Sequence, residues 1–308
     1  MYKLQGVIFI IAAAILFGIM PIWVKIAYST GLTSQVVALF RSGMAAVILG
    51  AVIYCRKKDF HVEREQMGPL LISTVLGYSG TIVTLYASYK YINSGVATSV
   101  HYLYPVLVML IVQYLYHEKL QFYKWLTLFI SLIGIFLISE PLGSGFSSLG
   151  VGLALGSALF FSIYTLSINN PLLKGMDSLV LAFYACLMTS FISTILLIVQ
   201  EKWPPVVTIK GLFYTSLVSF FCTVMALLLF IEGVKIIGSA NASILCTMEP
   251  VVSLVAGTII LHEPLTLCTV IGCILIVSAV ILIGYKDLSK DSIYLKKMIH
   301  TMKGKRTS

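Results

Sequence analysis

Residues 239–265, SANASILCTMEPVVSLVAGTIILHEPL, form an apolar run that carries an acid, Glu249, directly before Pro250 and far from either end. A helix needs about 20 apolar residues to cross a bilayer core, and this run is long enough. A carboxylate at membrane depth is costly and marks a candidate functional group. A proline inside a helix removes one backbone hydrogen bond. The stretch therefore predicts a membrane-spanning helix that is loosened next to a buried acid.

Residues 94–120, SGVATSVHYLYPVLVMLIVQYLYHEKL, echo this stretch. In each copy a proline is followed thirteen residues later by a glutamate that has a histidine before it, and the two copies lie 145 residues apart. The pairs are Pro105 with Glu118 and Pro250 with Glu263. Matched spacing of this kind indicates that the chain contains two copies of one element.

The composition is that of an integral membrane protein. Of the 308 residues 59% are hydrophobic and 11% are charged, whereas a soluble domain has about 25% charged residues. The formal net charge of +9 comes from residues at span ends and in the tail, a pattern typical of membrane topology and anionic-lipid contact rather than of nucleic-acid binding. The six cysteines show no metal-ligand spacing, so we expect neither a metal nor a cofactor.

The hydrophobic pattern predicts an all-α protein with ten transmembrane helices. Their expected positions are 5–27, 35–54, 68–90, 95–116, 122–139, 149–168, 177–200, 209–232, 239–261 and 266–285. With the N-terminus inside, 16 of the 21 Lys and Arg residues fall on cytoplasmic segments, which predicts cytoplasmic termini and a multi-pass protein of the plasma (cell inner) membrane.

Two further matches extend the internal repeat. Residues 90–94 align with 235–239, and residues 6–17 resemble 150–161. Each half then holds five spans, and because five is odd the second half enters the membrane inverted. We therefore expect two inverted five-helix repeats, 1–143 and 144–285, followed by a basic cytoplasmic tail, 286–308. In transporters, such a design places the substrate near the midplane between the halves.

The chain resembles the EamA family of the drug/metabolite transporter superfamily. The features that carry this resemblance are Glu249-Pro250-Val251, Glu263, Phe40-Arg41, Gly272, Pro105 and Glu118. The resemblance implies a ten-helix carrier with cytoplasmic termini and a central cavity, which moves small metabolites, often outward. One departure is that the first half has Tyr104 at the position of Glu249.

The candidate substrate-binding residues begin with Glu249, Tyr104 and His101. Glu249 has two interpretations that stay open: a substrate contact or proton-coupled switch, or a structural acid that bonds a backbone interrupted by the proline. Symmetry places Tyr104 opposite Glu249 across the cavity. His101 shares a helical face with Tyr104 and either exchanges protons or forms an interhelical hydrogen bond.

Further candidates would line the cavity wall and its mouth. Arg41 either forms a positively charged mouth for groups such as a carboxylate or snorkels to the interface. Trp23, Tyr78 and Tyr164 would add aromatic walls, with interfacial anchoring the alternative for Trp23 and packing the alternative for the tyrosines.

Three prolines are predicted to loosen their helices: Pro21, Pro105 and Pro250. Each should free the carbonyl four residues earlier. The resulting kinks would either flex during transport or serve static packing.

The family resemblance thus implies a secondary transporter of small metabolites, with efflux of amino acids or related compounds by alternating access. Proton coupling is a further hypothesis, which only Glu249 motivates. The partners would be a small-molecule substrate and the lipid bilayer, with protons a further candidate, and the protein would be a monomer or a homodimer. A nucleotide-sugar or lipid-linked carrier is the alternative, which would need more cavity cations. No GxxxxGK[ST] run is present, so nothing in the sequence indicates ATP-driven transport. No catalytic residue is assigned, because the sequence has no HExxH motif and no Ser or Cys elbow beside a His, and an intramembrane enzyme is the remaining alternative.

Overall fold

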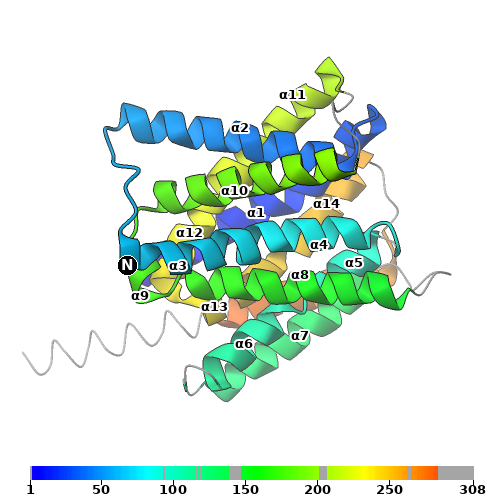
Figure 1. Cartoon of the computed structure of the whole chain (residues 1–308). Coiled ribbons are helices and arrows are strands. Elements are labelled where there is room, and N and C mark those ends of the chain that lie inside the picture. Colours follow the sequence, from blue (N-terminus) through cyan, green and yellow to red (C-terminus); the bar gives the residue numbers. More distant parts are fainter. Residues whose placement is uncertain are drawn as a thin grey trace, which may run out of the picture.

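The computed structural model describes residues 2–92, 94–114, 117, 120–138, 147–200, 207–261 and 265–283. Every regular element in these ranges is a helix (Figure 1). The helices up to residue 138 are α1 (Tyr2–Ser29), α2 (Ser34–Cys55), α3 (Arg64–Leu71), η1 (Ile72–Ser79), α4 (Gly80–Ser88), α5 (Ser94–His101), α6 (Tyr104–Tyr114) and α7 (Phe122–Ile138). Those after residue 147 are α8 (Ser148–Ser167), α9 (Pro171–Lys174), α10 (Ser178–Val199), α11 (Ile209–Leu217), η2 (Val218–Met225), α12 (Ala226–Ile237), α13 (Ser239–Leu245), η3 (Cys246–Met248), α14 (Glu249–Leu261) and a last helix, Leu267–Ile283.

Eight of the described helical stretches are long and apolar enough to cross a membrane. They are Lys3–Ser29, Ser34–Cys55, Arg64–Ser88, Val96–Tyr114, Ser148–Ser167, Ser178–Val199, Ile209–Ile237 and Ser239–Ile260. The fifth and tenth expected spans coincide with two shorter apolar helices, Phe122–Ile138 and Leu267–Ile283. The predicted spans thus fall on eight full-length helices and two shorter ones.

Polar side chains start several of these helices because the first N–H groups of a helix lack backbone partners. The side chains of Thr33, Ser147, Asp177 and Thr208 each accept a bond from a backbone N–H in the first turn of the helix that follows. Gly238 separates α12 from α13 and has a φ of 84°, a left-handed value that glycine adopts without steric strain.

Two long helices contain a π-helical segment: η1 inside the α3–α4 helix and η2 inside the α11–α12 helix. Hydroxyl groups support both widened turns. Ser79 Oγ donates to the Thr74 carbonyl oxygen at 2.8 Å, and Thr223 Oγ1 donates to the Val218 carbonyl oxygen at 3.1 Å. π-Helical turns are rare and often occur at functional sites, so the two segments direct attention to the middle of the molecule.

The helices pack in pairs that repeat between the two parts of the chain. α1 lies along α12, α8 lies along α4, and α2 lies against α10 (Figure 1). Gly6 of α1 meets Ile236 and Ile237, and Gly150 of α8 meets Tyr91 and Ile92. A side chain at either glycine would collide with these residues, so the two crossings need the same small residue at matching positions.

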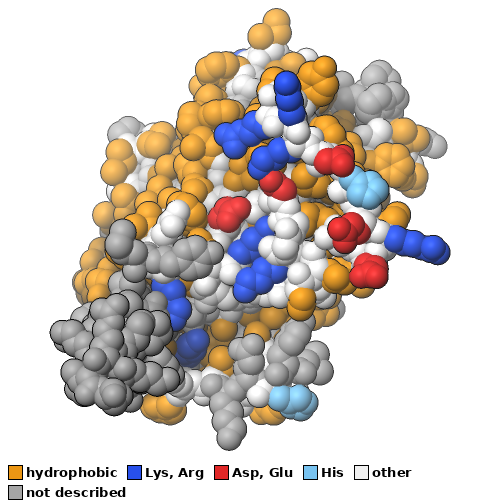
Figure 2. Space-filling view, turned by 90° about the vertical axis from the view of Figure 1, so that its left-hand side faces the viewer, with side chains coloured by type: hydrophobic (Ala, Val, Ile, Leu, Met, Phe, Trp, Pro, Cys, Tyr) orange, Lys and Arg blue, Asp and Glu red, His pale blue; other side chains and the backbone are white. Residues whose placement is uncertain are grey.

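The surface separates an apolar belt from a charged end. Phe129 and Phe136 lie seven residues apart on α7 and are 64% and 71% exposed, as expected of side chains that face lipid. Figure 2 shows that Lys, Arg, Asp and Glu side chains gather on the end of the molecule where α1 begins, with hydrophobic side chains around them. Lys58 pairs there with Asp177, which links the α2–α3 loop to the start of α10.

Candidate functional site

Two membrane-length helices are broken near their middle. The first changes from α5 to α6 through a turn at Tyr102 and Leu103, just before Pro105. The second changes from α13 to α14 through a 3-10 turn, Cys246–Met248, just before Pro250. Proline has no N–H to donate, so the regular bond pattern cannot pass through it. By contrast, α1 continues as one helix through Pro21.

Glu249 lies at the second break, as the first residue of α14, and its side chain is half-buried. It forms a side-chain hydrogen bond with Tyr102, which belongs to the break of the other helix. The two breaks therefore face each other, and an acid from the second half meets a phenol from the first. We call Glu249 and Tyr102 the polar centre.

The sequence did not single out Tyr102. Its neighbour Tyr104 has the same spacing to the proline as Glu249 has, so the repeat pointed to Tyr104 instead. The turn at 102–103 changes which side chain reaches across. Helical periodicity in a sequence cannot show which tyrosine reaches Glu249. It assumes a continuous helix, in which successive side chains are a fixed angle apart, and the turn at 102–103 changes that angle.

Tyr104 and His101 are both buried in the packed interior. The Tyr104 hydroxyl donates to the Ser243 carbonyl oxygen at 3.4 Å, which ties α6 to α13. His101 Nδ1 lies 3.0 Å from Ser157 Oγ, and the Ser157 hydroxyl itself donates to the Ala154 carbonyl oxygen. When the Ser157 hydroxyl donates to Ala154, its oxygen accepts from His101 in the tautomer with the proton on Nδ1. The contact is the interhelical bond that the sequence offered as the alternative for this histidine.

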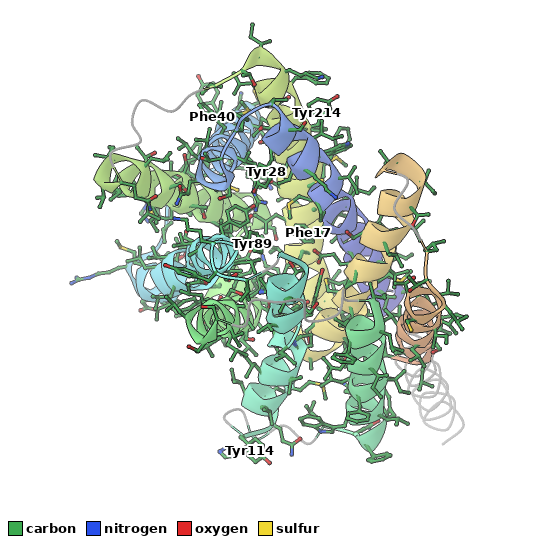
Figure 3. The ribbon with its side chains drawn as sticks, turned by 90° about the vertical axis from the view of Figure 1, so that its right-hand side faces the viewer. Phe17, Tyr28, Phe40, Tyr89, Tyr114 and Tyr214 are labelled. Atoms are coloured by element: carbon green, nitrogen blue, oxygen red, sulfur yellow. The ribbon has the colours of Figure 1, made fainter. Side chains whose placement is uncertain are left out.

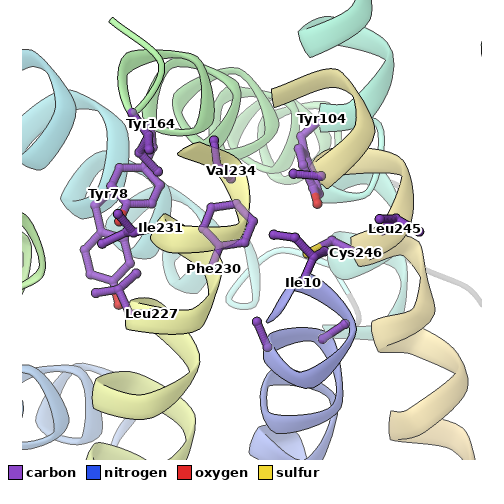
Figure 4. Packing of buried hydrophobic residues seen from close by; sticks show 14 of the residues in the cluster. Ile10, Tyr78, Tyr104, Tyr164, Leu227, Phe230, Ile231, Val234, Leu245 and Cys246 are labelled. Carbon is purple, nitrogen blue, oxygen red and sulfur yellow. The ribbon is translucent and has the colours of Figure 1, made fainter. Parts of the chain in front are cut away.

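Aromatic rings, among them those of Tyr104, Tyr164 and Phe230, fill part of the packed interior (Figure 4). The Tyr104 and Phe161 ring centroids are 4.7 Å apart, and Phe161 stacks on Phe230 at 5.8 Å. Tyr78 and Tyr164 are buried as well, with ring centroids 5.2 Å apart. In this structure the two predicted wall tyrosines and Tyr104 are packed against protein rather than against open space.

Arg41 lies in the interior and is 5% exposed. Its Nη1 contacts Met20 Sδ at 2.9 Å and the Tyr86 hydroxyl at 3.4 Å, and its Nη2 contacts the Tyr78 hydroxyl at 3.5 Å. The Arg41 carbonyl oxygen accepts a bond from Ser219 Oγ at 2.8 Å, which ties α2 to η2. Snorkelling to the membrane surface, the alternative for Arg41, does not describe this position.

Trp23 is half-buried on α1, and its ring lies 5.8 Å from that of Phe221 on η2. Lys25, two residues further along α1, is exposed. Figure 3 shows Phe17 and Tyr28 of α1 and Tyr89 in the region enclosed by α1, α2, α4 and α5. Trp23 and Tyr28 thus place half-buried aromatic side chains in the last two turns of α1.

Two cavities lie away from the polar centre and from Arg41. One, of about 300 Å³, opens near the start of α13. Its lining residues are Val112, Lys124, Leu166, Asn169, Lys174, Ile237, Gly238, Ser239, Ala240 and Asn241. The other, of about 510 Å³, is a mainly apolar groove between α2 and α10. The first cavity belongs to the end that the charge pattern predicts to be cytoplasmic.

Several predicted features fall elsewhere. Glu118, His262, Glu263 and the basic tail lie outside the described residues, and His117 is exposed.

Among the side chains that the structure describes, no three His, Cys, Asp or Glu residues gather as metal ligands would. A Cβ at Gly152 or Gly156 would meet nothing within 4 Å, so that face of α8 is open.

These features define a class: an all-helical, multi-pass membrane protein whose broken helices meet at a polar centre. The model of the EamA-like transporter family matches residues 4–140 and again residues 148–285. The chain therefore belongs to the EamA-like transporter family, and with it to the drug/metabolite transporter superfamily.

Relatives of known sequence agree with this assignment. An uncharacterized transporter of Archaeoglobus fulgidus is 28% identical, over 84% of this chain and 90% of its own length. The uncharacterized inner membrane transporter YicL of Salmonella typhimurium is 25% identical, over 91% and 95%. A solved crystal structure with 17% identity superposes with a TM-score of 0.79 over 89% of this chain and 94% of that one, which shows the fold alone. The chain is a membrane transporter of the drug/metabolite type.

Proposed function

We propose that this protein is a secondary transporter that exports small polar metabolites, such as amino acids or related compounds, by alternating access. The two halves, 1–143 and 144–285, would be inverted five-helix repeats that rock around a site between them. Both termini would be cytoplasmic, as the distribution of Lys and Arg predicts. Glu249, Tyr102 and Arg41 would contact the substrate.

The observation that carries this proposal is the bond between Glu249 and Tyr102. An ionisable group at membrane depth is functional by default, and transporters build their binding sites from interrupted helices near the midplane. Here each half contributes one interrupted helix and one member of the pair. Rocking of the halves would therefore change the surroundings of both side chains at once.

The helix contacts support two related halves. Gly18 of α1 lies against the Glu249 carbonyl oxygen, and a Cβ built on Gly18 would come within 2.7 Å of it. The matching contact in the other half is made by Ser162 of α8, whose hydroxyl donates to the Tyr104 carbonyl oxygen at 3.1 Å. In both halves, a small residue of the first helix contacts the backbone carbonyl of the residue just before the proline of the broken helix. The breaks are held in equivalent ways, as inverted repeats would require.

Proton coupling would act through Glu249. A carboxyl group inside the membrane is neutral, paired or exposed to water, and Glu249 is half-buried with a phenol as its partner. Its protonation could therefore change as the site alternates between the two sides. The buried His101 is already bonded to Ser157, so it serves this purpose less well.

A nucleotide-sugar or lipid-linked substrate fits the structure less well. Such substrates carry diphosphate groups and would call for several cations around the site. Among the described residues, Arg41 is the only Lys or Arg side chain that is buried, and Lys25 is exposed. A substrate with at most one anionic group suits this charge distribution better.

The test is counterflow in proteoliposomes against a panel of amino acids and other small metabolites, with and without a pH gradient. We expect flux with at least one member of the panel, and Glu249→Gln should reduce it by about tenfold or more, since a hydrogen bond to a charged group contributes about 1.5–3 kcal/mol. Glu65→Gln, which changes an exposed acid on α3, serves as the control and should transport normally. Unchanged flux in Glu249→Gln would refute both the binding and the coupling role.

A further inference from the structure

Arg41 is a buried cation whose described partners are all uncharged. They are a thioether sulfur and two phenol hydroxyls, and both contacts to phenols are long, at 3.4 and 3.5 Å. Arg41 forms no ion pair with any described carboxylate, and Glu249 uses Tyr102 as its partner instead. A buried charge is costly unless an opposite charge accompanies it. The positive charge of Arg41 therefore lacks its natural counterpart.

Two hydrogen-bond donors, one on Arg41 itself and one on a neighbouring helix, have no acceptor among the described residues. Arg41 Nε and the Tyr28 hydroxyl are each buried and have no hydrogen-bond partner among the described residues. They come from different helices, α2 and α1, yet Tyr28 interacts electrostatically with Arg41 and with Tyr86 and Tyr89. Buried polar groups in proteins are nearly always satisfied. Arg41 Nε and the Tyr28 hydroxyl are thus two unsatisfied donors that share an electrostatic neighbourhood, and one acceptor with two oxygens would satisfy both.

This place is within reach of the polar centre. Tyr89 interacts electrostatically with both Glu249 and Arg41, and so does Cys222 on η2. Tyr28, Tyr86 and Tyr89 are only half-buried. Arg41 and Glu249 therefore act on the same intervening side chains, and a substrate that contacts both would lie beside Tyr89.

The chemistry of Arg41 selects the missing group. The planar guanidinium of an arginine binds a carboxylate through two parallel N–H bonds. The ammonium group of a lysine cannot match the carboxylate in this way, because it is a compact point charge. Because Arg41 is the only buried Lys or Arg among the described residues, the site balances one negative charge. A diphosphate would leave negative charge uncompensated in a membrane interior.

We propose that Arg41 and Tyr28 form the binding site for a single carboxylate of the transported molecule, with Tyr78 and Tyr86 flanking it. This inference rests on the proposed transport function and adds the charge and shape of one substrate group. The carboxylate accepts bonds from Arg41 Nε, from one Arg41 terminal nitrogen and from the Tyr28 hydroxyl. The rest of the substrate points toward Glu249.

The test compares acids with their uncharged amides on purified full-length protein in detergent. The probe pairs are acetate and acetamide, phenylacetate and phenylacetamide, and L-phenylalanine and L-phenylalaninamide, each titrated at constant ionic strength. Affinity is read from the rise in Tm, because a ligand that binds only the folded state stabilises it. We expect the acid of at least one pair to bind about 10- to 100-fold more tightly than its amide, as a charge-assisted hydrogen bond implies.

Three variants show which residues cause this preference. Arg41→Gln should reduce it to about twofold or less, and Tyr28→Phe should weaken acid binding by about 2- to 10-fold, the range for one neutral hydrogen bond. Lys90→Gln removes an exposed positive charge at the end of α4 and should keep the wild-type preference. The preference is a property of binding, so a loss of stability alone does not reproduce it.

The outcomes separate this inference from the proposed function. No acid preference in any wild-type pair, or a preference that survives in Arg41→Gln, overturns the carboxylate site. If Arg41→Gln does not fold, Tyr28→Phe decides, and unchanged acid affinity in that variant overturns the site. Acid-selective binding without any flux in proteoliposomes supports the site and refutes transport. Flux without acid preference refutes the site alone.

Discussion

The break between α5 and α6 and the break between α13 and α14 hold different side chains in similar backbones. At the first, Tyr104 is fully buried and bonds to the Ser243 carbonyl oxygen. At the second, Glu249 occupies the matching place before the proline, is half-buried and bonds to Tyr102. The proline and a small residue on the neighbouring helix give both breaks their shape. The residue before the proline gives each its own chemistry, so related backbones need not imply related roles.

The largest effect is expected when an acid is placed at the α5–α6 break, as in the α13–α14 break. Tyr104→Glu would put a carboxyl group where the wild-type side chain is 2% exposed. We expect a loss of about 3 kcal/mol, the cost of an acidic residue at the centre of a membrane helix. Thermal unfolding in detergent measures it, with Glu65→Gln, a change to an exposed acid on α3, as a control that should unfold near the wild-type temperature. A stable Tyr104→Glu protein would mean that the two sites are interchangeable.

A second prediction tests whether the halves are equivalent where their last helices cross. Gly134 of α7 and Gly272 of the last helix face each other, and a Cβ at either would lie 2.6–2.7 Å from the carbonyl oxygen of the other. Gly134→Ala and Gly272→Ala should each cost about 1–3 kcal/mol, the usual effect of overpacking. Gly152→Ala, on an open helix face, is the matched control. Clearly unequal losses of unfolding free energy at the two positions would contradict equivalent packing.

A third prediction sharpens the contrast between the two tyrosines. Tyr102→Phe removes the partner of Glu249 and should lower counterflow by about tenfold, as expected for a bond to a charged group. Tyr104→Phe removes a long bond to a backbone carbonyl and should leave flux within about twofold, with a stability loss of about 0.5–1 kcal/mol. Equal effects of the two variants on flux would show that Tyr104 contacts substrate as the repeat predicted.

The smallest expected effect concerns the ion pair between Lys58 and Asp177 at the charged end of the molecule. Burial raises the pKa of Asp177, but bonds from Lys58 and from the Leu179 N–H outweigh it and hold the pKa below its ordinary value of 3.8. The stabilisation is therefore complete above that value and is lost as the pH falls through the lowered pKa.

Asp177→Asn keeps a helix-capping side chain but loses the charge. Near neutral pH it should unfold more easily than the wild type by a few tenths of a kcal/mol, because both partners are partly exposed to solvent. Thermal unfolding between pH 3 and pH 7 measures this difference, which should shrink at the acid end. A difference that grows as the pH falls would contradict the sign of the shift.

The sequence was most informative where one local cause dominates. Long apolar runs predicted the helices because backbone groups in lipid must bond within their own segment. The breaks near Pro105 and Pro250 lie where the missing N–H groups would put them. The π-helical segments were not foreseen, since their supporting bonds depend on hydroxyls such as Ser79 and Thr223, which are ordinary residues in a sequence pattern.

The candidate site was only partly predictable. Glu249 and Arg41 stood out because charged residues are rare in apolar runs. Their neighbours Tyr102, Tyr28 and Tyr89 did not, because 17 tyrosines are distributed along the chain and most have ordinary packing roles available. Tyr28 becomes notable only because its hydroxyl lacks an acceptor beside Arg41, which is a property of three helices together.

The sequence by itself determined that the chain lies in a membrane, where its helices run, and which two buried charges need an explanation. These properties follow from the cost of exposing polar groups to lipid, which acts residue by residue. Only the tertiary structure decided that Tyr102 rather than Tyr104 bonds to Glu249, and that Arg41 Nε and the Tyr28 hydroxyl are buried without a partner among the described residues. Those contacts depend on how a helix turns at its break and on which helices cross, and such choices are made by packing across the whole molecule.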